Sequence, residues 1–285
     1  MQRIERLPFT TYDILGYLVP GMYVFVMLLH YRLHDLFAAQ FGHFSSLSSF
    51  DVAVFLWVFV VGSFIVGHTI AYLSSLFTET LAVYAVGYPS EYLMCPQKMG
   101  SAEARRYIFG RIRKHNYHKK PGYFVICILF FPYTIVFATL VLIGLGKEFV
   151  KPLPNIAIIS MPKHFRHKIG GDFFVDGGRE WFFPIVHFCQ NVIPSANLRM
   201  YNYLTIYGFL RHISFSSYVF GWLYLMAPYV KSCFGLSYGF SSSSINLYCG
   251  YSLLIVGFIT FLGFLKFFRR FSEEAAMAFL LFRPS

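Results

Sequence analysis

The chain has 285 residues, of which 56% are hydrophobic and only 13% are charged. Soluble domains carry about a quarter charged residues, so this composition excludes the ordinary soluble globular class and indicates an integral membrane protein. Lysine and arginine outnumber the acidic residues by 24 to 13, a formal charge of +11. That excess suits anionic lipid headgroups, an anionic ligand, a nucleic acid or an anion pathway.

The first of five apolar segments covers residues 12–30. We interpret it as a retained membrane span rather than a cleaved signal, because its apolar run is longer than a signal-peptide core and no small-residue cleavage site follows. A kink or a close helix contact is predicted by Gly16, Pro20 and Gly21.

The second apolar segment, residues 50–78, completes an N-terminal membrane hairpin over 1–78. Its small residues, including Gly62 and Gly67, favour close helix packing over lipid exposure. His68 lies inside this span. We expect it to be packed in the interior or to lie at a pore or a subunit interface, and not to bind a metal.

Residues 79–121 contain eight lysines and arginines and are expected to be cytoplasmic. A turn is predicted at Gly87–Ser90, followed by a short basic helix with an apolar side. This helix is either an interfacial helix on anionic lipid or part of a solvated loop. Its candidate ligands for lipid or an anionic signal are Arg105, Arg106, Arg111, Arg113 and Lys114. The RxxxxH spacing from Arg113 to His118 matches a class of ribonucleases, but we interpret it as a chance match.

The third apolar segment, residues 122–146, is either a membrane span or a re-entrant segment. Pro132 near its middle permits a re-entrant bend, although a simple crossing uses 25 such residues more directly.

The connection over residues 147–205 predicts an extramembrane element. The segments HFRHKI and DFFVD flank Gly170 and Gly171, which indicates a two-residue β-hairpin. Four residues of the first segment, His164, Arg166, His167 and Lys168, are candidate ligands for a phosphate or a carboxylate, or are simply solvated.

The fourth and fifth apolar segments, residues 206–230 and 247–267, form a C-terminal membrane hairpin followed by a cytoplasmic tail at 268–285. Arg211 and His212 lie near the start of the fourth segment. A cation at membrane depth costs about 2.5–3.5 kcal/mol at a helix centre, so Arg211 either marks a pore or interface or reaches the headgroups. Gly250 and Gly257 of the fifth segment indicate a closely packed helix face.

These segments predict an all-α integral membrane protein with four or five transmembrane helices and a small cytoplasmic α+β element of one helix and one hairpin. The positive-inside rule places 31–49 and 231–246 outside and the N-terminus and all other connections in the cytoplasm, which favours four crossings.

No catalytic or nucleotide-binding motif occurs in the sequence, and the five cysteines show no metal-type pairing. We therefore expect no enzyme activity, cofactor or metal. A membrane enzyme acting on lipids is disfavoured for the same reason. Acidic residues are absent as pairs inside the spans, which argues against a proton-coupled transporter.

Four patches, YDILGYLVPG (12–21), GYPSEYL (87–93), YNYLTIYGFLRH (201–212) and RRFSEEAAMAFL (269–280), resemble small bacterial multi-pass proteins encoded beside phage-defence genes. In those proteins the position of His212 is more often Asn. The resemblance implies a cytoplasmic-membrane effector of abortive infection, which opens a pore after a soluble partner enzyme makes a signal, often a nucleotide.

Our leading hypothesis from the sequence is an oligomeric, gated ion pore that depolarises the host membrane when an anionic signal, such as a nucleotide or oligonucleotide, binds the basic loops. A homo-oligomer is expected because one chain of this size encloses little space. The alternative is a non-conducting membrane sensor or scaffold that recruits a soluble enzyme.

Overall fold

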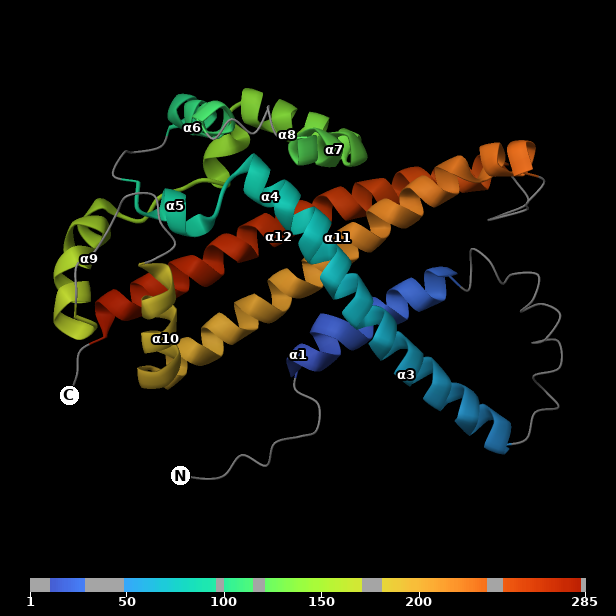
Figure 1. The fold of residues 1–285 in the computed structure, drawn as a ribbon, viewed down its shortest axis with the longest axis horizontal. Helices are drawn as coiled ribbons and strands as arrows, with labels where there is room; N and C mark the ends of the chain where they lie inside the picture. Colours follow the sequence, from blue (N-terminus) through green and yellow to red (C-terminus); the bar gives the residue numbers. More distant parts are fainter. Residues whose placement is uncertain are drawn as a thin grey trace. The chain divides into compact units, whose positions relative to one another are not determined.

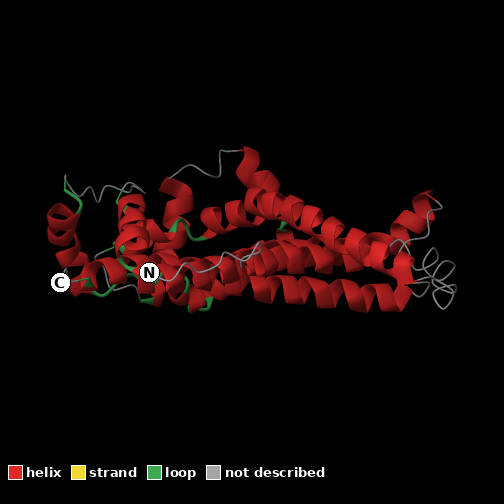
Figure 2. Cartoon of the chain, turned by 90° about the horizontal axis from the view of Figure 1, so that it is seen from below, coloured by secondary structure: helices red, strands yellow, loops and turns green. Residues whose placement is uncertain are grey.

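The computed structural model describes residues 11–28, 49–95, 100–114, 121–170, 181–234 and 243–282. Every regular element within these ranges is helical and none is a strand (Figure 2). The prediction of an all-α chain is therefore confirmed for the described residues, without the β-hairpin.

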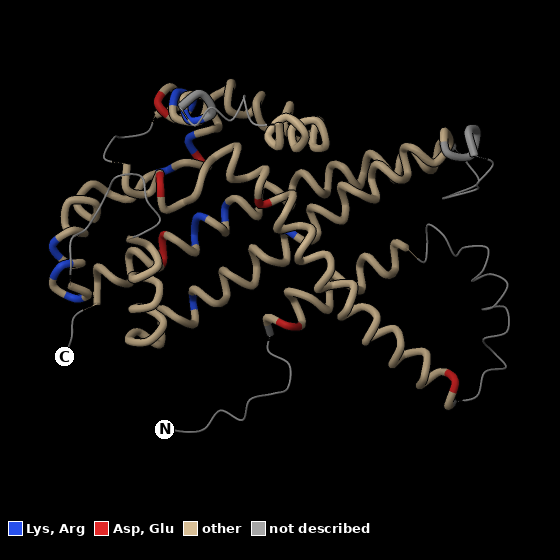
Figure 3. The backbone as a smooth tube through the Cα atoms, viewed as in Figure 1, with Lys and Arg blue, Asp and Glu red and all other residues tan. Residues whose placement is uncertain are grey.

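The chain divides into two compact units, one formed by Met1–Thr78 with Gly208–Phe264 and the other by Glu79–Tyr207 with Leu265–Ser285. Two long helices, α11 (Pro194–Phe234) and α12 (Ser243–Leu281), contribute to both units (Figure 1). In unit 1 the charged residues among those described are Asp13, Asp51, Arg211 and Lys231. Figure 3 shows most of the remaining Lys and Arg positions on the elements of unit 2.

Unit 1 begins with α1 (Thr11–Asp13) and a π-helical turn, η1 (Ile14–Leu18), after which the helix continues to Leu28. This helix crosses α3 (Ser49–Ser74) at two glycines. A Cβ atom on Gly21 would lie 1.7 Å from the Ser63 carbonyl oxygen, and one on Gly67 would lie 2.1 Å from that of Tyr17. Only glycine allows the two backbones to approach this closely.

The C-terminal parts of unit 1 pack in the same manner. A Cβ atom on Gly250 of α12 would lie 2.7 Å from Leu225 Cγ of α11, and Ser214 Oγ donates a hydrogen bond to the Gly257 carbonyl oxygen at 2.8 Å. Gly62, in contrast, has only the Phe25 ring at 3.4 Å. The small residues of these segments thus pack helices within one chain.

Among the described residues, two helices are long and apolar enough to cross a membrane, Phe50–Leu93 and Ser244–Leu281, and a third candidate arises if one bent pair is counted as a single span. These make the chain a candidate membrane protein. The described part of the first predicted span, Ile14–Leu28, is a shorter apolar helix. Helix α11 is long but more polar, because buried Ser214, Ser216 and Ser217 occupy its inner face.

The helix that contains α3 continues beyond its predicted end through η3 (Ser75–Glu79), at whose last residue unit 2 begins, and then through α4 (Thr80–Ala85). It stops at Gly87, whose φ of +88° lies in the left-handed region, as expected for the predicted turn. The helices that follow are α5 (Pro89–Leu93), α6 (Ser101–Lys114), α7 (Pro121–Leu129), α8 (Phe131–Leu142) and the 3₁₀ turn η5 (Leu145–Glu148).

The predicted β-hairpin is wrong for its first half, because HFRHK forms the end of α9 (Asn155–Lys168). Ala157, Met161 and Phe165 are buried at helical spacing, and this burial outweighs the turn signal. Gly170 has a φ of +81° just after the end of the helix, so this glycine ends a helix instead of reversing a strand. The second half of the predicted hairpin, residues 171–180, lies outside the described residues.

Helix α10 (Phe182–Val192) and the end of α12 complete unit 2. Cys189 is fully buried and its thiol donates to the Ala275 carbonyl oxygen of α12 at 3.4 Å. Aromatic side chains continue this contact, with the Phe188 and Phe279 ring centroids 5.3 Å apart.

Candidate functional site

Tyr17 lies between two histidines that were predicted as pore or interface residues, His68 of the second apolar segment and His212 of the fourth. Its ring stacks on the His68 ring of α3, with centroids 4.0 Å apart and an interplanar angle of 23°. The centroid of the His212 ring of α11 lies 6.4 Å from that of the Tyr17 ring, and the two rings are nearly parallel. Arg211 adjoins His212 through an Nη2 to Nε2 distance of 3.3 Å. We call Tyr17, His68, Arg211 and His212 the histidine cluster.

The backbone of the first helix supplies the anchor for this cluster. Pro20 has no amide hydrogen, so it cannot give the Gly16 carbonyl oxygen the hydrogen bond that the fourth residue along an α-helix supplies. His212 Nδ1 lies 2.7 Å from that oxygen instead. Because a carbonyl oxygen only accepts, Nδ1 carries the proton and donates. Nε2 of the neutral ring then accepts from the Arg211 guanidinium.

The cluster is buried at one end and exposed at the other. The His212 side chain is 1% exposed, Arg211 is partly buried and His68 is exposed. The residues around His68 on α3 that are also exposed are mostly apolar, among them Ile65 and Tyr72. An imidazole surrounded by lipid would lack partners on its free side, so this position suits contact with water or with another protomer.

The basic helix α6 separates its arginines into two environments. Arg105 and Arg106 are exposed, whereas Arg111 is 6% exposed. The Arg111 Nε donates to Glu91 Oε2 at 3.0 Å and Nη1 donates to the Val83 carbonyl oxygen at 2.5 Å. Arg111 therefore joins α6 to α4 and α5. The side chains of Arg113 and Lys114 lie outside those that the structure describes.

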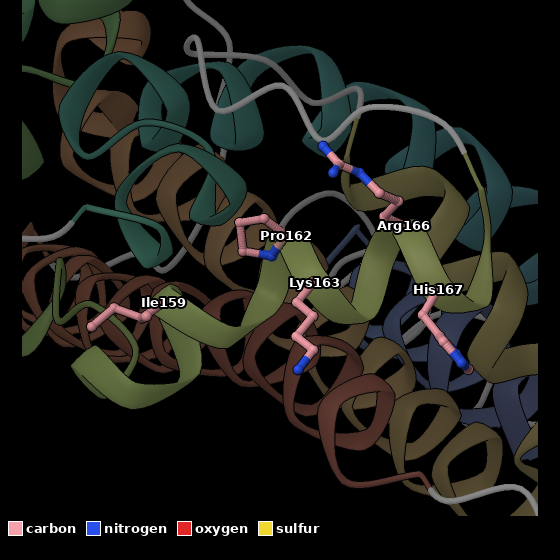
Figure 4. A pocket seen from close by; sticks show the side chains of 5 residues that line it. All are labelled: Ile159, Pro162, Lys163, Arg166 and His167. Atoms are coloured by element: carbon pink, nitrogen blue, oxygen red, sulfur yellow. The ribbon is translucent and has the colours of Figure 1, made fainter.

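A second cationic group lies on α9, where an open hollow of about 510 Å³ is lined by Ile159, Pro162, Lys163, Arg166 and His167. Figure 4 shows all five side chains on this one helix, with Lys163 and His167 on one side of it and Arg166 on the other. Their spacing of three and four residues follows from the helical period. We call these five residues the α9 face.

The other predicted residues of this segment point elsewhere. Lys168 Nζ donates to the carbonyl oxygens of Phe279 and Phe282 at 2.5 and 2.7 Å, so it caps the C-terminal end of α12, where the helix dipole favours a cation. Burial lowers the pKa of Lys168. The pKa of His164 is also lowered, first by burial and then by the neighbouring cations Lys168, Lys163 and His167.

Sequence reasoning missed several residues that the structure makes central, including Tyr17, Glu91 and Lys163. The helical spacing of Ile159, Lys163 and His167 was a readable signal, but the strand interpretation concealed it. Nothing in the sequence pointed to Tyr17, since its role arises from helix crossing.

Among the described residues no group of three or more His, Cys, Asp or Glu side chains is placed to hold a metal ion. Comparison of the chain with protein-family models, curated proteins and solved structures gives no match.

Proposed function

We propose that this protein is an oligomeric effector of the bacterial cytoplasmic membrane that forms a gated ion pathway and depolarises the host during antiviral defence. The single observation that carries the pathway is the histidine cluster. It combines a cation, Arg211, with an exposed imidazole, His68, inside segments that are otherwise apolar. The role in defence rests on the sequence resemblance alone.

The proposed topology has four or five crossings, made by the first helix, the Phe50–Leu93 helix, α11, α12 and optionally the bent pair α7–α8. Helix α11 has 41 residues, about 60 Å at 1.5 Å per residue, which is twice the thickness of the hydrocarbon core. Its polarity fits an interior position in an assembly, where protein rather than lipid covers the serines.

In this proposal His68 faces a pore or a neighbouring protomer. A ring of such sites in a homo-oligomer would place several Arg211 guanidinium groups around one axis, which favours anions over cations. The neutral His212 ring makes two hydrogen bonds, which hold Arg211 in place and join α11 to the first helix.

The trigger is an anionic signal that binds the open arrangement more tightly than the closed one. The α9 face supports this role, because Lys163, Arg166 and His167 are exposed around a hollow whose volume lies in the range of small-ligand sites. Along α12, Phe279, which contacts Lys168, lies 13 residues or about 20 Å beyond Lys266. That distance favours a water-soluble phosphate compound over membrane lipid at this helix.

The test measures membrane potential with a voltage-sensitive dye in bacteria that express the chain alone or with the genes beside it. We expect depolarisation that depends on those genes and falls at least tenfold in His68→Leu and Arg211→Ala. Leu56→Ala is the matched control. Leu56 is 55% exposed on the same helix but lies 12 residues before His68, about 120° around the helix from it, so the depolarisation should be unchanged.

Reversal of charge at Lys163 and Arg166 should abolish triggering, while reversal at Arg105 and Arg106 should not. An unchanged potential under conditions that activate the neighbouring genes would reject the pore. The second candidate, a non-conducting scaffold, would then be supported by co-purification of a soluble enzyme that is lost in the α9 variants.

A further inference from the structure

The bent pair α7–α8 presents apolar side chains that the described residues of unit 2 leave exposed. Helix α7 has no buried residue, and Phe124 and Ile128 on it are 65% and 57% exposed. Helix α8 buries Tyr133, Phe137 and Val141 against unit 2 and leaves its outer side exposed. The opposite side of α7 is half-buried against α4, where the Tyr123 and Tyr84 ring centroids are 5.3 Å apart. The exposed apolar surface of the pair lies between two basic stretches of the sequence, a pattern that suits insertion among acyl chains beneath anionic headgroups.

The bend has a local cause. The axes of α7 and α8 differ by 94°. Pro132, at the start of α8, has no amide hydrogen, and its ring would clash with the carbonyl of Ile128 if the helix continued. The Thr134 hydroxyl donates to the carbonyl oxygens of Phe131 at 2.9 Å and Cys127 at 3.4 Å, which supplies a donor on each side of the bend. Such compensation is required of backbone groups at membrane depth.

The bend also makes the pair too short to cross. Helix α7 has 9 residues and α8 has 12, about 14 and 18 Å at 1.5 Å per residue. With a 94° bend their outer ends are about 22 Å apart, compared with a hydrocarbon core of about 30 Å. If both ends lie at one membrane surface, the bend reaches a depth of about 11 Å, within one leaflet.

Positive charge flanks the pair on both sides. The sequence before α7 contains Lys114, Lys119 and Lys120, and the sequence after α8 contains Lys147 and Lys151. Lysines next to membrane segments mark the cytoplasmic surface and complement anionic headgroups. Arg269 Nη1 donates to the Glu148 carbonyl oxygen at 3.1 Å, which places the end of η5 beside the basic stretch of α12.

We propose that α7 and α8 form a re-entrant hairpin that enters the cytoplasmic leaflet, with its apolar face in contact with phospholipid acyl chains, and returns to the same surface. The chain then crosses the membrane four times, and every strongly basic connection lies on the cytoplasmic side. This inference rests on the multi-pass topology of the proposed function but not on ion conduction.

The first experiment labels single cysteines in the full chain, after replacement of the five native cysteines by serine. Gly122→Cys lies at the start of the hairpin, where the added Cβ would meet no other part of the chain within 4 Å, and Lys147→Cys follows the hairpin. A membrane-impermeant maleimide should label both at least tenfold more in inverted vesicles than in intact cells with a permeabilised outer membrane. Ser241→Cys, which the sequence predicts to be outside, should show the reverse. Labelling of Gly122→Cys and Lys147→Cys from opposite sides would overturn the hairpin.

The second experiment keeps the native cysteines and places the photo-crosslinker p-benzoylphenylalanine at Phe124. Irradiation in native membranes should yield phospholipid adducts, detected by mass spectrometry. Ile159 on α9 is the matched control, because it is 79% exposed yet should give at least tenfold fewer lipid adducts. Dimer-sized protein adducts at Phe124 in place of lipid adducts would assign the face to a second copy and overturn the proposal. Neither readout depends on conduction, so a non-conducting protein with both ends cytoplasmic would reject the pore but keep the hairpin.

Discussion

The crossing of the first helix with α3 can be tested by adding one methyl group. In Gly67→Ala the new Cβ would lie 2.1 Å from the Tyr17 carbonyl oxygen, while real contacts of this kind do not fall below 3.0 Å. The two backbones must therefore separate by at least 0.9 Å, the difference between these values. Tyr17 moves with its backbone, so the substitution also disturbs the stacking of its ring on His68.

Overpacking of this kind costs about 1–3 kcal/mol, which corresponds to an apparent Tm about 3–9 °C lower for a domain of 150–250 residues. Gly62→Ala is the matched control, because it lies on the same helix and its Cβ would be 3.4 Å from the Phe25 ring, an ordinary contact. Both substitutions share the same gain in helix propensity, so the difference between their Tm values reports the effect of the close backbone contact alone.

The assay is thermal unfolding of the purified protein in detergent, with the folded fraction measured by size-exclusion chromatography after heating. We expect Gly67→Ala to unfold several degrees below the unmodified protein and Gly62→Ala to match or exceed it. Gly21→Ala, with a Cβ 1.7 Å from the Ser63 carbonyl oxygen, should be at least as damaging. Equal Tm values for Gly67→Ala and Gly62→Ala would refute the close crossing.

Three further predictions concern unit 2. Arg111→Met leaves Glu91 partly buried without its guanidinium and should cost about 3–5 kcal/mol, whereas Arg111→Met combined with Glu91→Leu should recover much of that loss in the same unfolding assay. The pKa of His164 is lowered by burial and nearby cations, so an anion bound at the α9 face should raise this pKa. By linkage, the affinity of the protein for inorganic pyrophosphate should increase as pH falls through the pKa of His164. A Kd that does not change with pH, measured by titration calorimetry, would contradict this. Burial raises the pKa of Cys189 to about 11, so iodoacetamide at pH 8 should alkylate Cys95 at least tenfold faster than Cys189 in the folded protein. Unfolding should remove this difference in rate. Equal alkylation rates in the folded protein, measured by mass spectrometry, would show that Cys189 is accessible.

The sequence by itself determined which segments can lie in the membrane and which lie in water. An apolar run long enough to cross a bilayer must be helical, because only a helix satisfies its own backbone hydrogen bonds there. The α3 and α12 candidates follow directly from this rule, whereas the basic helix α6 was predicted from the apolar residues along one of its sides. Local chemistry also predicted the turn at Gly87 and the bend permitted by Pro132, since both depend on residues adjacent in sequence.

Only the tertiary structure decided which distant residues meet. Pairing of His212 with the Gly16 carbonyl oxygen, 196 positions apart, depends on how the first helix crosses α11, and no local pattern encodes that crossing. The strand prediction at HFRHK failed for the same reason, because burial of Phe165 on α12 outweighed the turn signal of two glycines. Local propensities differ by about 1 kcal/mol, whereas a buried aromatic side chain contributes about 1.5–3 kcal/mol, so packing prevails where the two conflict.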